Sequence, residues 1–326
     1  MTRPWTGFSI RRVAVGLALG AVALLAGCGS SSVVSDLQAE RFIAVGDGFS
    51  DVGQGPTGQP YTVADGSPTW LQQLASYYKL EVKPASAGGW GYAQGHARVD
   101  SADPRGAPSV REQVDELLAA TTLDPKKDVV FINGGMNDIV AAVEATGISE
   151  ATNKAVEAAA DALAEQVRRL RDAGARHIAV IGVYWLGQSP WGRAYGHRVE
   201  LNELSNRFNT RLLVGDQKSV LGIAPFQDNS VAYVDAAAFY YTGVSTDVDR
   251  VNDRWKSMPI DNLGDAVCNT PDASTCTPST LKAGVSDYDR YLFADDLHLT
   301  PAAQRLFSDS GYSIKGSVYY ELHERW

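Results

Sequence analysis

Asp295 and His298 are the two side chains in this sequence whose types and spacing most clearly indicate chemistry. A carboxylate and an imidazole three residues apart on a turn can hydrogen-bond, and the carboxylate then fixes which ring nitrogen faces a substrate. Such a pair supplies the general base of acyl transfer. Acyl transfer also needs a nucleophile and donors aimed at the oxyanion that develops on the carbonyl. A site of this kind would therefore need a nucleophile and oxyanion donors besides the pair.

Two candidate oxyanion donors follow strand-like apolar segments. The side-chain amide of Asn137 can donate, and so can the backbone N–H of Gly48 at the N-terminus of a following helix. No nucleophile stands beside them. Ser50 has the nearest hydroxyl, but two residues along a helical turn rotate a side chain by about 200°, so it should point away. Alone, the turn at Gly48 is an ordinary tight turn, and His298 is an ordinary histidine.

Four blocks of sequence, in order, resemble the signature blocks of the GDSL/SGNH family of ester hydrolases. Residues 46–53 (Gly-Asp-Gly-Phe-Ser-Asp-Val-Gly) are similar to a block whose third residue is the nucleophilic serine. Residues 88–99 resemble a block in which a glycine offers its N–H to the oxyanion. Residues 134–138 (Gly-Gly-Met-Asn-Asp) and 295–300 (Asp-Asp-Leu-His-Leu-Thr) resemble the blocks that supply the oxyanion asparagine and an Asp-x-x-His pair.

The resemblance implies a role for each matched residue. Asp295 and His298 would be the orienting carboxylate and the base, and Asn137 would donate to the oxyanion. Two positions depart from the pattern, because Gly48 replaces the nucleophilic serine and His96 replaces the oxyanion glycine. A Cβ at position 96 disfavours the backbone conformation that glycine adopts readily, or else the ring fills the acyl pocket. The supporting residues of these blocks are Asp47, Gly135 and Asp138.

The elements that must position these residues alternate between strand-like and helix-like, which predicts a parallel sheet with helices on both faces. Continuous apolar runs indicate buried strands at residues 42–45, 129–132, 178–183 and 231–234. Helical periodicity is found at residues 110–120, 153–173 and 201–214, with Gly174 at an expected helix end. The fold class is therefore α/β. The resemblance implies a flavodoxin-like three-layer sandwich, in one domain with long loop insertions.

The N-terminus is typical of a bacterial lipoprotein. Arginines precede an apolar stretch at residues 13–25, which is short for a membrane span and typical of a signal peptide. It ends in Leu-Ala-Gly-Cys, which resembles the site of cleavage before a lipidated Cys28. We therefore expect a signal peptide (1–27), a flexible tether (28–38) and a hydrolase-like domain (39–326). Glycine after the cysteine favours the outer membrane, facing the periplasm, and an uncleaved membrane helix is the alternative.

Charge and cysteine usage limit the partners. The chain has 29 Lys and Arg against 38 Asp and Glu, and residues 1–27 carry three of the arginines and no acid, so the mature charge is −12. Nucleic acid is excluded on this ground. Besides Cys28, the cysteines are Cys268 and Cys276, which we expect to pair in an oxidising periplasm. Closing this loop stabilises by about 2–3 kcal/mol. A metal pair is the alternative, but it lacks further ligands.

Two loop regions are predicted to lie on the substrate side, at residues 184–197 and in a long insert at residues 239–291. Their aromatic residues either form an acyl or sugar platform or pack the loops on themselves. The predicted ligand is an ester of a small molecule, a lipid or an acylated glycan. The sequence indicates no cofactor and no particular oligomeric state.

Three functions are compatible with these residues. The first is a lipid-anchored hydrolase of carboxylic esters, weak or decayed, in which a water occupies the space beside Gly48 and is deprotonated by His298. The second is a non-catalytic envelope protein that binds an ester or acylated glycan in the same cleft. The third is a metal hydrolase that uses His96 and His298 with Asp47 or Asp138. These ligands have no recognisable spacing, so we rank it last.

Overall fold

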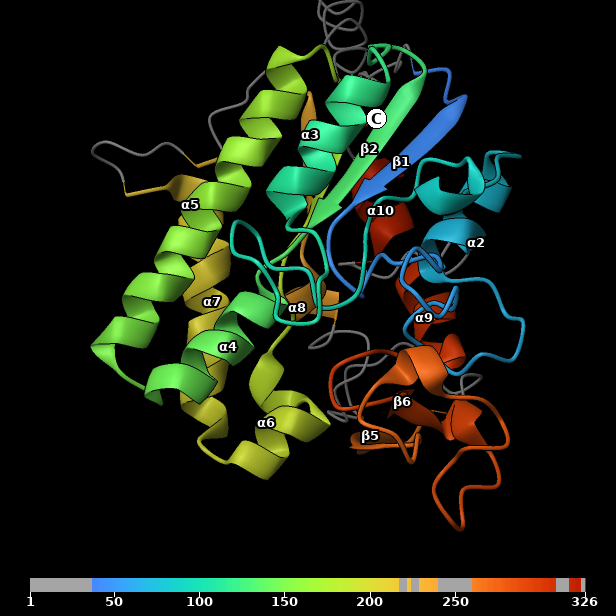
Figure 1. Cartoon of the computed structure of the whole chain (residues 1–326), viewed down its shortest axis with the longest axis vertical. Coiled ribbons are helices and arrows are strands. Elements are labelled where there is room, and N and C mark those ends of the chain that lie inside the picture. The colour runs from blue at the N-terminus through green and yellow to red at the C-terminus, as the bar shows by residue number, and fades with distance from the viewer. Residues whose placement is uncertain (1–36, 217–221, 224–228, 240–259, 309–316, 324–325) are drawn as a thin grey trace, which may run out of the picture. The chain divides into compact units, whose positions relative to one another are not determined.

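The structure is a computed structural model and describes residues 37–216, 222–223, 229–239, 260–308, 317–323 and 326. The predicted signal peptide, Cys28 and part of the predicted insert lie outside these residues. Residues 36–326 form one compact unit. Its centre is a four-stranded parallel sheet in the order β1-β2-β3-β4 (Figure 1). The strands are β1 (Arg41–Val45), β2 (Asp128–Asn133), β3 (Ile178–Ile181) and β4 (Val231–Val234).

The strands form where the sequence has continuous apolar runs, because both faces of the sheet are covered. Every residue of β2 and β3 is buried. The predicted α/β class is therefore confirmed. One strand is shorter than predicted, since β3 ends at Ile181 and not at Val183. The side chain of Asn209 takes over the hydrogen bonds of Val183, accepting from its N–H at 2.8 Å and donating to its carbonyl at 2.7 Å.

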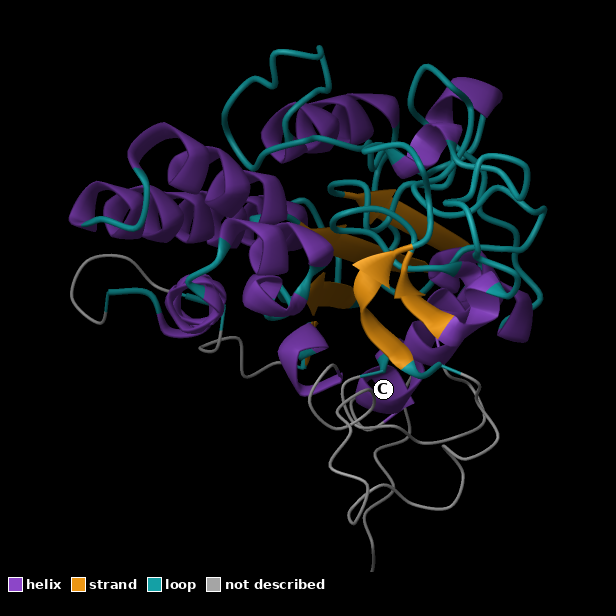
Figure 2. Cartoon of the chain, turned by 90° about the horizontal axis from the view of Figure 1, so that it is seen from below, coloured by secondary structure: helices purple, strands orange, loops and turns teal. Residues whose placement is uncertain are grey.

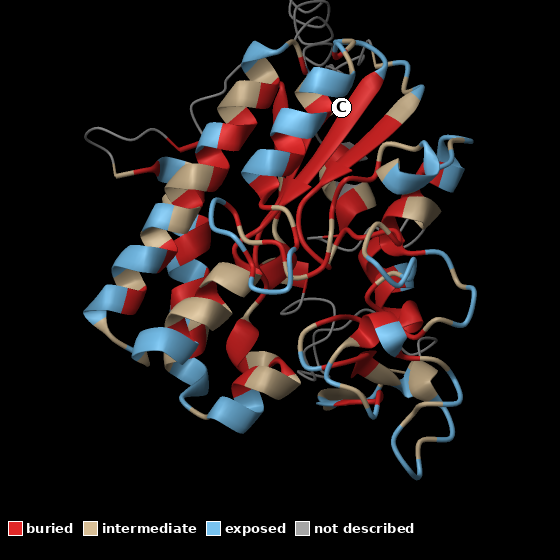
Figure 3. Cartoon of the chain, in the orientation of Figure 1, coloured by how far each residue is buried: buried red, intermediate tan, exposed pale blue. Residues whose placement is uncertain are grey.

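Helices cover both faces of the sheet, with α3 in front and α10 behind in Figure 1. α5 contacts α3, α4, α7 and β3, whereas α10 contacts β4 and α9, and α9 contacts α2. Figure 3 shows that α5 is buried on the side facing the sheet and exposed on the other. The helices are α2 (Trp70–Tyr77), α3 (Val110–Ala120), α4 (Met136–Thr146), α5 (Glu150–Asp172), α6 (Pro190–Tyr195), α7 (Arg198–Val214), α8 (Ala236–Phe239), α9 (Pro301–Ser308) and α10 (Val318–His323).

Two helices begin before their predicted starts. α5 begins at Glu150 because the hydroxyl of Ser149 accepts the N–H of Thr152 at 3.2 Å. Gly174, with φ +112°, follows its C-terminus as predicted. α7 begins three residues before the predicted start.

Two further features position the site. The free edge of β1 is bridged by the loop of the second block, because Ala44 accepts from Tyr92 at 2.7 Å and donates to Trp90 at 3.0 Å. A second parallel sheet pairs β5 (Asn262–Ala266), which lies in the described part of the insert, with β6 (Tyr291–Phe293), which begins at the last residue of the insert (Figure 2). No helix within the described ranges has the length and apolar character needed to cross a membrane.

Candidate active site

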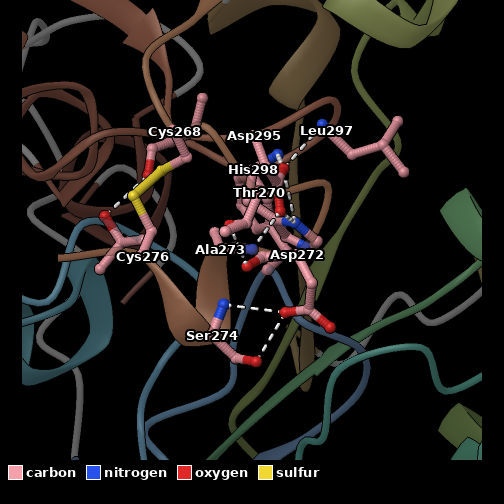
Figure 4. Close-up of polar contacts among 12 residues, drawn as sticks. Cys268, Thr270, Asp272, Ala273, Ser274, Cys276, Asp295, Leu297 and His298 are labelled. Carbon is pink, nitrogen blue, oxygen red and sulfur yellow. Dashed lines mark hydrogen bonds and ion pairs between the residues drawn. A yellow bond between two sulfur atoms is a disulfide. The ribbon is translucent and has the colours of Figure 1, made fainter. Parts of the chain in front are cut away.

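The pair Asp295 and His298 lies on the turn that follows β6. Asp295 Oδ1 accepts the backbone N–H groups of Leu297 at 2.8 Å and His298 at 2.7 Å, so the carboxylate itself shapes the turn. His298 Nδ1 then lies 3.0 and 2.9 Å from the two carboxylate oxygens of Asp295 (Figure 4). This local geometry is why a spacing of three residues brings the two side chains together.

Both members of the pair are buried, with Asp295 2% and His298 5% exposed. Burial acts to raise the pKa of Asp295, but the charge of His298 and the donors around the carboxylate outweigh it and lower that pKa. Burial acts to lower the pKa of His298, but the Asp295 carboxylate outweighs it and raises that pKa. An ionised Asp295 only accepts hydrogen bonds, so Nδ1 carries the proton and Nε2 of the neutral ring is bare.

Nε2 of His298 points at the position from which a side chain is missing. A Cβ on Gly48 would lie 2.5 Å from this nitrogen and 3.1 Å from Cγ of Tyr61. Nε2 is buried and hydrogen-bonds to no residue that the structure describes. The sequence predicted room for a water beside Gly48, and that prediction is wrong. The imidazole and the Tyr61 ring fill the space instead, because protein interiors close most gaps that a missing side chain would leave.

Tyr61 is a site residue that the sequence did not reveal. Its ring centroid lies 4.8 Å from that of His298 and 5.4 Å from that of His96. The residue is 5% exposed. A Cβ on Gly95 would overlap the Tyr61 ring, so that position must remain glycine. The one sequence signal for Tyr61 is indirect: Gly95 lacks a side chain, which indicates that some other group packs closely against it, but the sequence does not say which group.

His96 adopts the backbone that the sequence argued against. Its φ is +68°, in the left-handed region. Two anchors hold it there, since the neighbouring Gly95 donates its N–H to Asp51 at 2.9 Å and His96 Nε2 lies 3.0 Å from Asp272 Oδ2. Burial acts to raise the pKa of Asp272, but hydrogen bonds from His96 and Ser274 outweigh it and lower that pKa. The ring is thus tied to a carboxylate.

The backbone N–H groups of Gly48 and His96 remain available as oxyanion donors. Neither donates a hydrogen bond to any residue within the described ranges. Gln94 donates to the carbonyl of Gly46 at 3.1 Å, which joins the second block to the first. The structure therefore brings the two family positions that lost their usual residues into one region, beside the base.

Asn137 and its neighbours begin α4. Gly135 precedes the helix with φ +103°, and a Cβ there would overlap the ring of Phe208. The side-chain amide of Asn137 donates to the carbonyl of Ala97 at 3.0 Å, and its second N–H is committed to no described residue. Asp138 accepts the N–H of Val99 at 3.1 Å. Burial and, more weakly, the charge of Asp47 raise the pKa of Asp138 to about 7.

Asp47 is a second buried carboxylate near the base. It accepts the amide of Asn133 at 2.6 Å and the N–H of Phe49 at 3.0 Å. Burial raises its pKa. Asp51 holds the far end of the same turn by accepting the N–H groups of Gly53 and Gln54, both at 2.7 Å. The turn of the first block is therefore held by hydrogen bonds to two carboxylates.

Comparison with known proteins identifies the family of this chain. Over residues 42–310, which is more than half of the chain, the sequence matches the family described as GDSL-like lipase/acylhydrolase. The chain belongs to this family. No curated protein matches the chain.

Solved structures similar to this GDSL-like chain include an extracellular lipase from Streptomyces rimosus, 14% identical, with a TM-score of 0.41 over 88% of this chain and 100% of that one. A phospholipase A1 from Streptomyces albidoflavus is 16% identical, with a TM-score of 0.39 over 88% and 100% of the two chains. An acetyl xylan esterase from Geobacillus stearothermophilus is 13% identical, with a TM-score of 0.36 over 67% and 88%.

The disulfide loop of this GDSL-like chain supports Asp295. Cys268 and Cys276 are joined, with Cα atoms 5.8 Å apart. Between them, Ala273 donates its N–H to Asp295 Oδ2 at 2.9 Å (Figure 4). The carbonyl of Cys276 accepts the N–H of Ala64 at 2.8 Å, close in the chain to Tyr61. This part of the insert therefore supports Asp295. The location of the insert on the substrate side stays a prediction.

The residues proposed as metal ligands are committed elsewhere. His96 and His298 each hydrogen-bond to a different carboxylate, Asp272 and Asp295. Within the described ranges, no three His, Cys, Asp or Glu side chains are grouped so as to hold a metal ion. The thiols of the insert are engaged in the disulfide.

Proposed function

We propose that this protein is an envelope-anchored hydrolase of carboxylic esters that turns over slowly, because position 48 offers no nucleophilic side chain. One observation carries the proposal. Asp295 and His298 are held in hydrogen-bonded contact, with the unpaired Nε2 directed at Gly48. Two backbone N–H groups that donate to none of the described residues lie in the adjoining turns. Oxyanion donors and substrate binding alone retain about 10³–10⁴-fold acceleration over water in serine hydrolases that lack a triad member.

A second candidate is an ester-binding protein without turnover. The burial of Nε2 against Gly48 and Tyr61 favours it, because a base that no substrate reaches does no chemistry. Against it stands the fourfold support of Asp295, which accepts from Leu297, from Ala273 and from both the backbone and the ring of His298.

The proposed location is the bacterial envelope. We propose cleavage after residue 27, lipidation of Cys28, and attachment to the outer membrane with the domain facing the periplasm. The Leu-Ala-Gly-Cys sequence after a short apolar segment supports this. The proposed tether starts at residue 28 and is shorter than predicted, because Gln38 already donates its backbone N–H to Lys126 at 2.8 Å. The ester would be that of a small molecule, a lipid or an acylated glycan.

The experiment that separates turnover from binding measures both on one protein. Hydrolysis of p-nitrophenyl acetate and butyrate is compared between wild type and His298→Ala, and binding of the matching ethers, which cannot be hydrolysed, is followed by calorimetry. We expect wild type to exceed His298→Ala by at least about 10²-fold in kcat/KM. Equal rates together with measurable ether binding would instead establish the binding protein.

A further inference from the structure

We propose that His298 is itself the nucleophile, and that its Nε2 carries the acyl group between the two halves of the reaction. The inference rests on the proposed function, which is ester hydrolysis at this site. It differs from the water mechanism in the bond that forms first. In the water mechanism the imidazole only removes a proton, whereas here it forms a covalent acyl-histidine.

The position of the ring is the first argument. In a serine hydrolase the hydroxyl oxygen lies between the serine Cβ and Nε2, with about 2.8 Å from oxygen to nitrogen. In this chain a Cβ on Gly48 would stand only 2.5 Å from Nε2. The nitrogen has therefore advanced into the region that a serine hydroxyl occupies. A water cannot stand between the ring and residue 48, so the atom nearest a bound carbonyl is Nε2.

The electronic state of the ring is the second argument. Asp295 holds the proton on Nδ1, which leaves the lone pair of Nε2 free. That nitrogen has no hydrogen-bond partner among the described residues and is buried. Histidine is among the side chains that form covalent catalytic intermediates. Burying an imidazole nitrogen without a hydrogen-bond partner also lowers the stability of the fold, which is a cost that a catalytic role of the nitrogen would explain.

The donors for the oxyanion are the third argument. The N–H groups of Gly48 and His96 are uncommitted within the described residues, and they belong to the turns next to Nε2. A carbonyl oxygen bound by them places the carbonyl carbon beside residue 48. The attacking atom there is Nε2 of His298.

Both half-reactions balance without a cofactor. In the first, the Nε2 lone pair bonds to the carbonyl carbon, and the carbon–oxygen bond breaks, so the phenolate or alkoxide leaves with that electron pair. Asp295 stabilises the positive acylated ring through the Nδ1 proton. In the second, water adds to the acyl carbon, the carbon–nitrogen bond breaks, and its electron pair returns to Nε2. The products are the alcohol and the carboxylate, with one proton released to solvent.

This chemistry restricts the substrate class. The tetrahedral adduct expels whichever group leaves more easily, and an imidazole leaves far more easily than an alkoxide. Phenols and thiols ionise near pH 10 and about 8.5, so their anions leave competitively. We therefore expect aryl esters and thioesters to be hydrolysed and simple alkyl esters to be poor substrates.

An ester reaches Nε2 only when the Tyr61 ring turns aside. The tyrosine covers the histidine with centroids 4.8 Å apart and is itself buried. Tyr61→Ala, which removes the cover without touching Asp295 or His298, should therefore accelerate acylation of His298. A water mechanism predicts faster hydrolysis in the same variant but no acylated protein.

The decisive experiment uses wild-type protein, so it does not depend on whether a variant folds. The protein is mixed with p-nitrophenyl acetate, quenched rapidly, digested and analysed by mass spectrometry. We expect one acetyl group on the peptide that contains His298, removed by hydroxylamine, and a burst of p-nitrophenolate equal to the enzyme concentration. His197→Asn, at an exposed histidine with φ +53° that asparagine tolerates, is the matched control and should behave as wild type.

A second measurement tests for a common intermediate. With hydroxylamine present, the ratio of acetohydroxamate to acetate should be the same from p-nitrophenyl acetate, phenyl acetate and S-phenyl thioacetate. Turnover that needs His298 but gives no burst, no acyl peptide and a ratio that varies with the leaving group would overturn the inference and leave the proposed function intact. An acetyl group on Ser50 or Tyr61 would also overturn it. Rates equal to those of His298→Ala would remove the proposed function itself.

Discussion

Gly48→Ser is the substitution that tests most directly how close His298 lies to position 48. In a working serine–histidine pair the serine Cβ lies about 3.5 Å from Nε2, because the hydroxyl oxygen stands between them. Here that distance would be 2.5 Å. The ring must therefore retreat by about 1 Å. The Tyr61 ring, whose Cγ would lie 3.1 Å from the new Cβ, must also give way.

The retreat sets the size of the expected gain. His298 would loosen its hydrogen bonds to Asp295, each worth about 1.5–3 kcal/mol as a bond to a charged group. A loss of about 2–3 kcal/mol lowers the rate roughly 10²-fold. A nucleophile acting with its base is worth up to about 10⁶-fold. We therefore expect Gly48→Ser to raise kcat/KM by about 10⁴-fold, while overpacking lowers the free energy of unfolding by about 1–3 kcal/mol.

The assay combines rates, labelling and thermal stability. Hydrolysis of p-nitrophenyl butyrate gives the rate, a fluorophosphonate probe labels the introduced serine if its hydroxyl is reactive, and the melting temperature reports the strain. Gly48→Ala is the matched control, since it adds the same Cβ without a hydroxyl. It should be destabilised equally and remain unlabelled. A Gly48→Ser protein that folds at the wild-type melting temperature, neither labels nor accelerates, and leaves the ring in place would refute the reasoning.

Three other predictions follow from the same contacts. Burial acts to lower the pKa of His298, but Asp295, Asp47 and Asp272 together raise it, so kcat/KM should fall as pH drops through an inflection above the ordinary value of 6.5. Asp295→Asn should move that inflection to lower pH, and a flat profile would count against His298 as base or nucleophile. Wild type should incorporate a palmitate analogue in cells and Cys28→Ser should not, and equal labelling would favour an uncleaved membrane helix. Replacing Cys268 and Cys276 by serine should lower the free energy of unfolding in denaturant titrations by about 2–3 kcal/mol. Activity should fall in parallel because the loop positions Ala273 against Asp295, and alkylation of the denatured wild type should find neither thiol free.

Much of the fold was predictable because its signals are local. Buried parallel strands require continuous apolar runs, and β1, β2 and β4 lie within one residue of their predicted ends. α3 matches its predicted bounds, with Ser109 as a cap. β3 and α5 differ where a side chain from elsewhere, or a cap outside the periodic segment, takes over backbone hydrogen bonds.

In the candidate site, too, the local contacts were predictable and the long-range contacts were not. Asp295 and His298 were predictable as a pair because one turn of the chain brings them together. The contact between His96 and Asp272 joins residues 176 positions apart in the sequence, and no local sequence pattern predicts a contact over that separation. Tyr61 was missed for the same reason.

The state of Gly48 shows a different limit. The sequence establishes that a side chain is missing but not what takes its place. Whether water, ligand or protein fills such a gap depends on packing from several elements at once, here the turn after β6 and the loop that carries Tyr61. The sequence also predicted that His96 would not readily adopt a left-handed backbone, and it does adopt one. Asp51 and Asp272, which lie outside the second block, hold that backbone in place.

The central claim is that His298 presents a bare Nε2 to the place of the missing nucleophile, with its proton held on Nδ1 by Asp295. Nitrogen-15 NMR of the imidazole in the mature protein, recorded above the pH of the kinetic inflection, tests it directly. We predict the neutral tautomer protonated on Nδ1, with an unprotonated Nε2 signal that shifts when an ester analogue binds. A ring protonated on Nε2, or one that averages between tautomers as a solvent-exposed histidine does, would contradict the account.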